Sequence, residues 1–355
     1  MSEGLRVAYF PGCTLKTDAR DFESSALAVA RALGIEVAEL SRWNCCGTVY
    51  SLDAVNLMPR LASVHNLIRA EEEGFSEIMT LCSMCYNTLK RTNNLFTSRN
   101  SDLVSDAPWR ATINDFLCLD PGYSRRCAVA CGRVKIYHFL EFLREKIKPE
   151  QVKSLVVSPL AGLAVAPYYG CLLLRPKEIA IDDPEKPEIL TPILSALGAK
   201  VIDFPLNNEC CGAYQTTIHQ EAVVRRAYRI INSAQSEGAD MIAVSCPLCH
   251  YNLSALPARV GVPVRPCAGP GRQSLVRSTH LVPQAMPQAD SPRRTDSPGR
   301  TGLKAMPIIY FTEVMARAMG LDYRTGVKVI PQDVAAAEAH PLSSWDGGPG
   351  REAAK

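Results

Sequence analysis

The sequence predicts an α/β fold of two duplicated units, each with a mainly parallel sheet and helices. Three blocks of sequence recur in the same order at a nearly constant offset, which indicates internal duplication. Within each copy, short apolar runs alternate with stretches of helical period, a pattern typical of parallel strands joined by helices. The recurring blocks are residues 7–13, 33–47 and 72–89 in the first copy and residues 165–171, 197–212 and 236–253 in the second.

The first copy begins with a short apolar run, Leu5 to Phe10, which we expect to be a strand ended by Pro11 and Gly12. Asp21 to Leu33 carries its apolar residues on one helical face and is therefore expected to be a helix. The further elements expected in this copy are a strand over 35–40, a helix over 57–73 and a strand over 78–81.

The second copy is expected to repeat this order. Its elements are a strand over 164–168, a helix over 188–197, a strand over 200–204, a helix over 220–236 and a strand over 241–245. In both copies the cysteines follow strands, at the carboxyl ends where open α/β sheets place their ligands.

The segments outside the repeats complete the expected domain organisation. The connection contains a predicted helix, Tyr137 to Ile147, and another helix is expected from Met306 to Met319 with Pro307 in its first turn. Residues 268–300 are rich in Pro, Ser, Arg and Gln, so we expect them to be dispensable for folding and for metal binding. The predicted parts are a first unit (1–100), a connecting segment with a helix (101–160), a second unit (161–262), a flexible insertion (263–305), a C-terminal helix packing on the core (306–340) and a disordered tail (341–355).

Ten of the fourteen cysteines form one pattern that is used twice: a single Cys, then CCG, then CxxC. Thiolates are the usual ligands of iron–sulfur clusters and also bind zinc. A cubane cluster or a zinc site takes four cysteines, so either one thiol in each set is spare or the cluster is not a simple cubane. The two candidate ligand sets are Cys13, Cys45, Cys46, Cys82 and Cys85, and Cys171, Cys210, Cys211, Cys246 and Cys249.

Structural zinc remains open as an alternative, above all for one of the two sites. Gly47 and Gly212 follow the cysteine pairs and are expected to adopt positive φ. For His250, beside Cys249, we favour a surface or packing role over a bond to sulfur. The remaining cysteines have no counterparts between the copies and are not expected to be ligands; they are Cys118, Cys127, Cys131 and Cys267.

Composition narrows the classes of function. The net charge is only +3 and no stretch concentrates Lys and Arg, which argues against a nucleic-acid-binding protein. The chain starts with no secretory signal, and no apolar run approaches the roughly 20 residues that span a bilayer. We therefore expect a cytoplasmic protein, with any membrane contact peripheral and through partners. Reduced thiols in that compartment favour metal binding over disulfides.

The sequence resembles the B-type component of heterodisulfide reductase, which carries two cysteine-rich CCG domains. The motifs that carry the resemblance are YFPGC, NCCG, CSMCYNTL, PYYGCLLLRP, CCGAY, SCPLCHYNL and MPIIYFTEVMARAMG. It covers nearly everything except residues 263–305 and the tail. The resemblance implies two noncubane 4Fe–4S clusters, each held by all five cysteines of one set. It also implies that the two units are related by a pseudo-twofold axis and that a disulfide is cleaved between the clusters.

The resemblance further implies partners and a substrate. Electrons would arrive through a C-like component with cubane 4Fe–4S clusters and, before it, an A-like flavoprotein. The substrate would be the heterodisulfide of coenzyme M and coenzyme B or a related disulfide. A second hypothesis is an electron-relay subunit of a membrane-associated, quinone-linked dehydrogenase, which cleaves no disulfide. A third is a binding module with structural zinc only.

Overall fold

The computed structural model describes residues 5–47, 60–97, 134–260, 306–323 and 328–329. All of them belong to one of the two units into which the chain divides, residues 1–262 together with 306–355. The other unit, residues 263–305, lies outside the described residues, as do the expected tail and the four cysteines that were not expected to be ligands.

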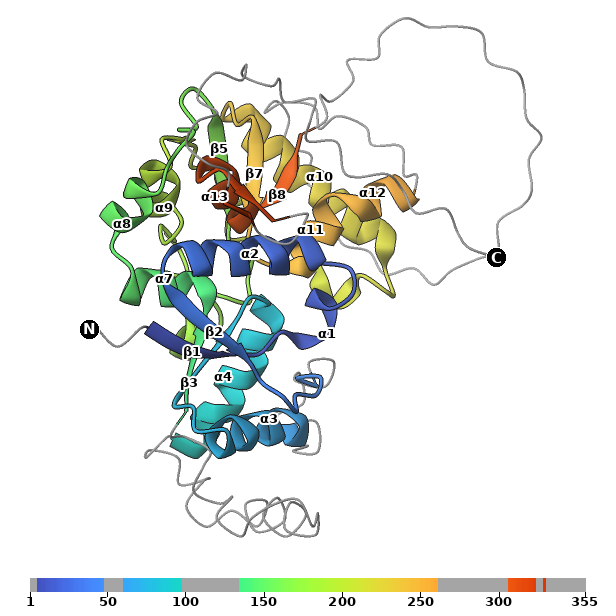
Figure 1. Ribbon diagram of the computed structural model, residues 1–355. Helices are drawn as coiled ribbons and strands as arrows, with labels where there is room; N and C mark the ends of the chain where they lie inside the picture. Colours follow the sequence, from blue (N-terminus) through green and yellow to red (C-terminus); the bar gives the residue numbers. More distant parts are fainter. Residues whose placement is uncertain (1–4, 48–59, 98–133, 261–305, 324–327, 330–355) are drawn as a thin grey trace, which may run out of the picture. The chain divides into compact units, whose positions relative to one another are not determined.

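The first sheet has four parallel strands in the order β2-β1-β3-β4. Figure 1 labels β1, β2 and β3 of this sheet. The register places Leu5 beside Ile35 and Ala8 beside Ile78, so β1 lies in the interior of the sheet. Its residues 7–9 are fully buried, as expected for a central strand covered on both faces. The strands are β1 (Leu5–Tyr9), β2 (Ile35–Glu39), β3 (Glu77–Thr80) and β4 (Lys135–His138).

The second sheet repeats this topology in the order β6-β5-β7-β8, again with parallel pairing throughout. The predicted fold class, two duplicated α/β units, is therefore confirmed. The expected strand over 200–204 is shorter than predicted because regular pairing ends at Val201. The strands are β5 (Ala164–Tyr168), β6 (Lys200–Val201), β7 (Met241–Val244) and β8 (Ile308–Tyr310).

Helices connect and cover the strands. In the first half they are α1 (Gly12–Leu15), α2 (Arg20–Ala32), α3 (Leu61–Glu72), α4 (Ser83–Thr97), α7 (Phe139–Lys146) and α8 (Pro149–Ser154). In the second half they are the 3₁₀ turn η3 (Lys177–Ile179), α9 (Thr191–Ala196), the 3₁₀ turn η4 (Ala213–Gln215), α10 (Gln220–Ser236), α11 (Pro247–Leu253), α12 (Ala255–Val260) and α13 (Phe311–Ala318). A short antiparallel pair is formed by β9 (Leu321–Asp322) and β10 (Lys328–Val329).

Two predicted helices start later than expected. Tyr137 and His138 belong to β4, and the helix of this segment begins at Phe139. Met306 and Pro307 precede β8, so the predicted helix over 306–319 is wrong over its first turn. In both places a strand of three or four residues runs directly into an amphipathic helix, so the two elements together resemble one longer helix in sequence.

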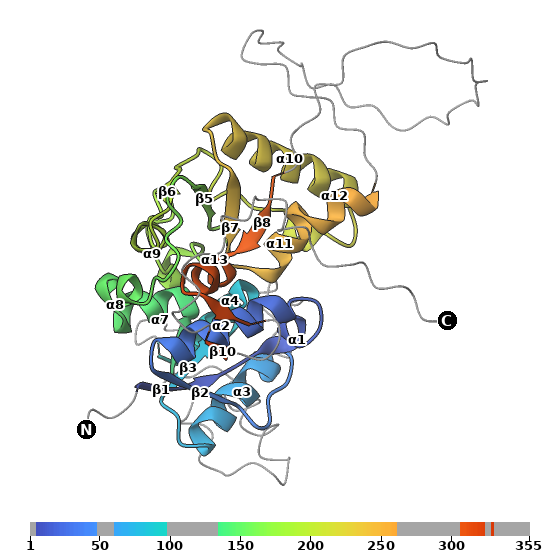
Figure 2. The ribbon, with the colours of Figure 1, turned by 45° about the horizontal axis from the view of Figure 1, so that its top comes forward.

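The two halves pack together through helices of both, among them α2, α7 and α13. Helix α2 of the first half lies against α13 of the second in both ribbon views (Figure 1, Figure 2). There Phe22 stacks on Tyr310 with ring centroids 4.2 Å apart. Phe139 and Phe311, the first residues of the equivalent helices α7 and α13, contact each other at 6.1 Å. A contact between equivalent residues is expected near a twofold axis.

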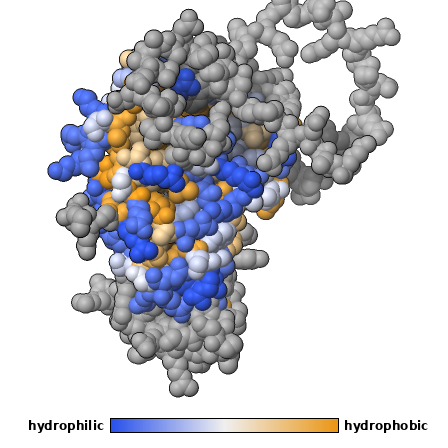
Figure 3. Space-filling model, in the orientation of Figure 1, coloured by the Kyte–Doolittle hydropathy of each residue, from blue (hydrophilic) through white to orange (hydrophobic). Residues whose placement is uncertain are grey.

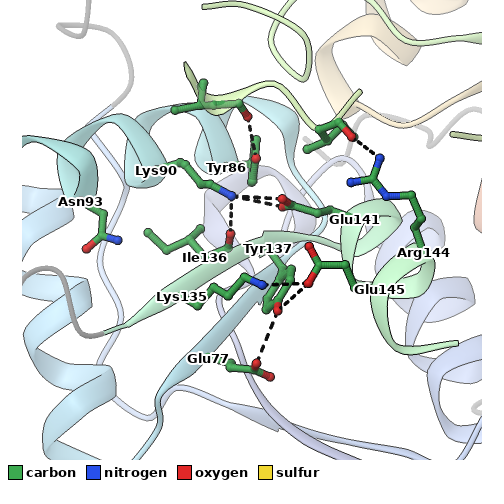
Figure 4. A network of polar contacts seen from close by, with 12 residues as sticks. Glu77, Tyr86, Lys90, Asn93, Lys135, Ile136, Tyr137, Glu141, Arg144 and Glu145 are labelled. Atoms are coloured by element: carbon green, nitrogen blue, oxygen red, sulfur yellow. Dashed lines mark hydrogen bonds and ion pairs between the residues drawn. The ribbon is translucent and has the colours of Figure 1, made fainter. Parts of the chain in front are cut away.

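A polar network attaches the loop after Cys171 to the first half (Figure 4). Tyr86 donates a hydrogen bond to the carbonyl of Ile179 at 2.7 Å, and Arg144 donates one to the carbonyl of Ile181. Close by, Lys90 pairs with Glu141 at 3.1 Å, and both side chains are largely shielded from solvent. The first half thus supports a segment that carries a candidate ligand of the second.

The face shown in Figure 3 has hydrophilic and hydrophobic residues interspersed over the part of the chain that the structure describes. Among the large apolar side chains of the described residues, Val157 and Ile218 are exposed, at 56% and 70%. Within the described residues, no helix combines the length and the hydrophobicity needed to cross a bilayer.

Candidate metal centre

The ten predicted ligands follow the first three strands of each half of the chain, at the carboxyl ends of those strands. Cys13 lies in α1 directly after β1, the Cys45–Cys46 pair follows β2, and Cys82 and Cys85 are at the junction of β3 and α4. The second half repeats this arrangement: Cys171 follows β5, the adjacent pair Cys210 and Cys211 follows β6, and Cys246 and Cys249 follow β7. Because the strands are parallel, their carboxyl ends meet at one edge and bring together cysteines that are far apart in sequence.

The second set is closely associated. The Sγ atoms of Cys249 and Cys211 are 3.4 Å apart, and both thiols are buried. Cys171 hydrogen-bonds to Cys210, and Cys246 hydrogen-bonds to Cys249. Cys171 also lies within electrostatic range of Cys211 and Cys246, so all five thiols belong to one connected group.

The first set is connected in the same manner. Cys85 hydrogen-bonds to Cys46 and to Cys82, and Cys45 hydrogen-bonds to Cys46. Cys13 is linked to this group through its electrostatic effect on Cys45. Cys13 and Cys45 are exposed, whereas the other three are buried. The structure therefore brings each predicted five-cysteine set together.

The thiols strongly influence one another's ionisation. The hydrogen bond from Cys171 lowers the pKa of Cys210 to about 5, and the bond from Cys249 lowers the pKa of Cys246 to about 7. Hydrogen bonding to neighbouring thiols, followed by burial, raises the pKa of Cys171, Cys45 and Cys85. Without a cation, Cys45, Cys85 and Cys171 therefore stay protonated at neutral pH. A bound metal would supply the positive charge that allows all five to act as thiolate ligands.

A glycine precedes the first cysteine of each set and leaves room for a ligand of the same set. Gly12 has φ +72°, and a Cβ atom there would lie 2.8 Å from the Sγ of Cys85. Gly170 has φ +64°, and its Cβ would lie 3.2 Å from the Sγ of Cys249. Gly47 and Gly212, which follow the cysteine pairs, have positive φ of 77° and 90° as expected. The GC dipeptide shared by both copies was the available signal for Gly12 and Gly170.

Polar groups donate to sulfur in the second set. The backbone N–H of Gly212 donates to the Sγ of Cys210 at 3.3 Å. The side-chain amide of Asn252, fully buried, donates to the Sγ of Cys211 at 3.5 Å and to Thr216 at 3.0 Å. Asn252 was not predicted, because the equivalent residue of the first copy is Thr88 and the repeat pattern gave no signal for it.

The buried side chain of Tyr310 lies near both sets. Burial, then the charges of Cys246, Glu313 and Cys82, raises the pKa of Tyr310, so this tyrosine is near thiols of both sets. The ring of His250 stacks on Tyr310 with centroids 4.4 Å apart, which agrees with the packing role expected for it. Burial lowers the pKa of His250 to about 4, so the ring is neutral at neutral pH.

The donor set fits a soft-metal cluster in its chemistry: ten thiols in two groups, mostly buried, with glycines that leave space beside them. Within the ranges that the structure describes, no three His, Cys, Asp or Glu side chains are arranged closely enough to hold a single metal ion.

Comparison with known proteins agrees with the duplicated architecture. The family model of the cysteine-rich CCG domain matches residues 7–90 and, separately, residues 165–254. A membrane anchor subunit of 8-methylmenaquinol:fumarate reductase from Wolinella succinogenes is 31% identical over 248 residues, which is 69% of this chain and 81% of that protein. The chain belongs to the CCG-domain family that includes the B-type component of heterodisulfide reductase.

Two further relatives of this CCG protein carry the reductase name. The B-type component of the ferredoxin/F420H2-dependent CoB-CoM heterodisulfide reductase of Methanosarcina acetivorans is 28% identical over 69% of this chain and 78% of its own length. A protein of Archaeoglobus profundus, named as similar to that component of heterodisulfide reductase, is 24% identical over 93% of this chain and 96% of its own length.

The fold also matches a crystal structure of a hypothetical protein from Helicobacter pylori, with a TM-score of 0.57 and 13% sequence identity. The match covers 89% of this chain but only 49% of the solved chain. It supports the fold alone.

Proposed function

We propose that this chain is the catalytic subunit of a heterodisulfide reductase-like complex and reduces a disulfide with two electrons. The observation that carries the proposal is the convergence of two five-thiol groups on matching sheet edges, with Tyr310 close to thiols of both. Membership of the CCG family and the reductase relatives support an oxidoreductase with iron–sulfur clusters.

Each five-cysteine set would hold one 4Fe–4S cluster of the noncubane type. Use of all five thiols accounts for the fifth cysteine, which a simple cubane would leave spare. Gly12 and Gly170 keep the space beside Cys85 and Cys249 free of a Cβ atom. Asn252 and the Gly212 N–H direct hydrogen-bond donors at sulfur, which stabilises thiolate ligands.

The proposed reaction consumes two electrons and two protons and converts one disulfide into two thiols. Each cluster would supply one electron, so both are needed for one turnover. The electrons would come from a partner subunit with cubane 4Fe–4S clusters, itself served by a flavoprotein subunit. The chain's own residues hold the two ligand sets at one interface and, through buried Tyr310 and His138, limit access of water to it.

The substrate is proposed by class: a mixed disulfide of two small thiols, the CoB–CoM heterodisulfide or a related compound. Relatives from Methanosarcina species are named for that substrate, which supports the class.

A second candidate is an electron-relay subunit that serves a quinone-linked enzyme. The Wolinella relative favours it, because that protein is named a subunit of a menaquinol:fumarate reductase. Such a subunit would transfer electrons without cleaving a disulfide.

Disulfide reduction by the parent protein separates the two candidates, and cysteine variants test whether both clusters are needed. Cys46→Ser and Cys211→Ser each remove a buried thiol from one set and should each abolish disulfide reduction with a low-potential dye or the partner subunits as donor. Cys267→Ser is the matched control and should keep full activity. Full activity after loss of one cluster would contradict the two-cluster mechanism. An intact complex that reduces quinone but no disulfide would favour the relay.

A further inference from the structure

His138 connects the two candidate sites at their buried junction. The side chain is completely buried, and its Nδ1 accepts a hydrogen bond from the backbone N–H of Leu140 at 3.3 Å. The Nε2 atom must therefore carry the proton, and it donates to the carbonyl of Leu81 at 2.8 Å. The imidazole also lies close to the backbone of Ser245, which influences its pKa.

Leu81 and Ser245, the backbone neighbours of His138 in the two halves, occupy equivalent positions in the repeat. Leu81 directly precedes Cys82, and Ser245 directly precedes Cys246. One imidazole therefore hydrogen-bonds to the residue before the first CxxC motif and lies close to the residue before the second.

Ser83 makes a second connection of the same kind. Its side chain is 1% exposed, and its hydroxyl donates to the carbonyl of Ser245 at 3.1 Å across the two halves. The same hydroxyl also interacts with the thiol of Cys246. Ser83 is adjacent to Cys82 in the first set, so it connects a ligand of one set directly to a ligand of the other.

These contacts come from one half only. The residue equivalent to Ser83 is Pro247, which has no hydroxyl and no backbone N–H to donate. The residue equivalent to His138 is Tyr310, the N-cap of α13, whose ring stacks on Phe22 and His250 instead. The duplication has therefore kept the cysteines in both halves but the cross-connecting donors in one.

We propose that His138 and Ser83 form a polar clamp that fixes the spacing and relative orientation of the two cluster sites. The clamp acts on the backbone next to Cys82 and Cys246, so it would position the clusters rather than contact the reacting atoms. This inference rests on the proposed function in that it assumes one cluster in each set. It applies equally to disulfide reduction and to electron relay, because both require the clusters to remain within electron-transfer distance.

The test is electron paramagnetic resonance of the reduced protein, which detects magnetic interaction between two nearby clusters. The variants are Ser83→Ala, His138→Leu and His138→Gln, the last of which keeps a side-chain N–H donor. The matched control is Ser25→Ala, which also removes a buried hydrogen bond between the halves, to Thr312 at 2.6 Å, but from α2 and α13. Iron content and urea unfolding are measured for each protein.

We expect Ser83→Ala and His138→Leu to retain their iron and to lose or change the interaction signal, with His138→Gln restoring it. Ser25→Ala should lose comparable stability and keep the parent signal. If His138→Leu does not fold, Ser83→Ala decides the question. If the interaction signal is unchanged in Ser83→Ala, the clamp proposal is wrong and the proposed function is unaffected. The same holds if a parent protein with two full clusters shows no interaction signal. A parent with fewer than two clusters would overturn the clamp and the proposed function together.

Discussion

Replacing Gly12 with alanine tests the geometry of the first site, because the change adds only one methyl group. Gly12 has φ +72°, and a left-handed backbone costs a non-glycine residue about 1–2 kcal/mol. The new Cβ would also lie 2.8 Å from the Sγ of Cys85. An ordinary van der Waals separation requires the thiol to retreat by roughly 0.7 Å. That displacement exceeds the tolerance of about 0.2 Å for metal–ligand distances.

Gly34 provides the matched control for this variant. Its φ is +75°, and a Cβ placed there would meet no atom within 4 Å. Gly34→Ala therefore imposes the same backbone strain without contacting a thiol. Both variants should lose about 1–2 kcal/mol of unfolding free energy in urea. Only Gly12→Ala should also lose iron, about four atoms of about eight per chain if both clusters are 4Fe–4S.

The assay is iron and acid-labile sulfide per chain in anaerobically purified protein, alongside urea unfolding. Gly170→Ala makes the equivalent test of the second site, where the Cβ would lie 3.2 Å from Cys249 and a smaller loss is expected. If Gly12→Ala keeps as much iron as Gly34→Ala, then Cys85 is not a ligand or the site adapts more than the close contact implies.

Three further predictions concern other residues. Asn252→Leu removes a hydrogen bond to the sulfur of Cys211 and should shift the midpoint potential of the second cluster to a more negative value. The first cluster serves as the internal reference. If both midpoint potentials stay unchanged, Asn252 does not have this role. Burial lowers the pKa of His138 from its ordinary value near 6.5 to about 4. As the pH falls between these two values, only the unfolded state takes up a proton on this residue, so the free energy of unfolding decreases. Between pH 6.5 and 5.5 the parent should lose about 1 kcal/mol more than His138→Gln, measured by urea unfolding, and equal losses would show that His138 titrates normally when folded. Serine replacement of the four unrepeated cysteines should leave the iron content unchanged, and loss of one cluster from any of them would reveal a missed ligand; they are Cys118, Cys127, Cys131 and Cys267.

The repeat made most of the fold predictable. Cysteines at fixed positions aligned the two copies, so a strand recognised in one copy predicted its equivalent, as with β1 and β5. The fourth strand of each sheet was missed because β4 and β8 have only four and three residues and lead straight into helices. Their assignment depends on pairing with β3 and β7, a tertiary interaction that local pattern does not contain.

The candidate ligands were predictable because their spacing is periodic in sequence, and the structure brings each predicted set together. The supporting residues were not. Asn252 has no counterpart in the first copy, and His138 lies in a segment that was expected to be a connection. The importance of both arises from distance in space, since His138 is 57 residues from Leu81 along the chain. Such contacts are visible only once the two halves are folded together.

The most direct test of the central claim is the metal and sulfide content of the full chain, purified without oxygen. Two clusters predict about eight irons with matching acid-labile sulfide per chain, and a loss of about half in both Cys46→Ser and Cys211→Ser. Stoichiometric zinc without acid-labile sulfide, or iron that disappears entirely from one of these variants while the other keeps the parent content, would contradict two independent iron–sulfur sites.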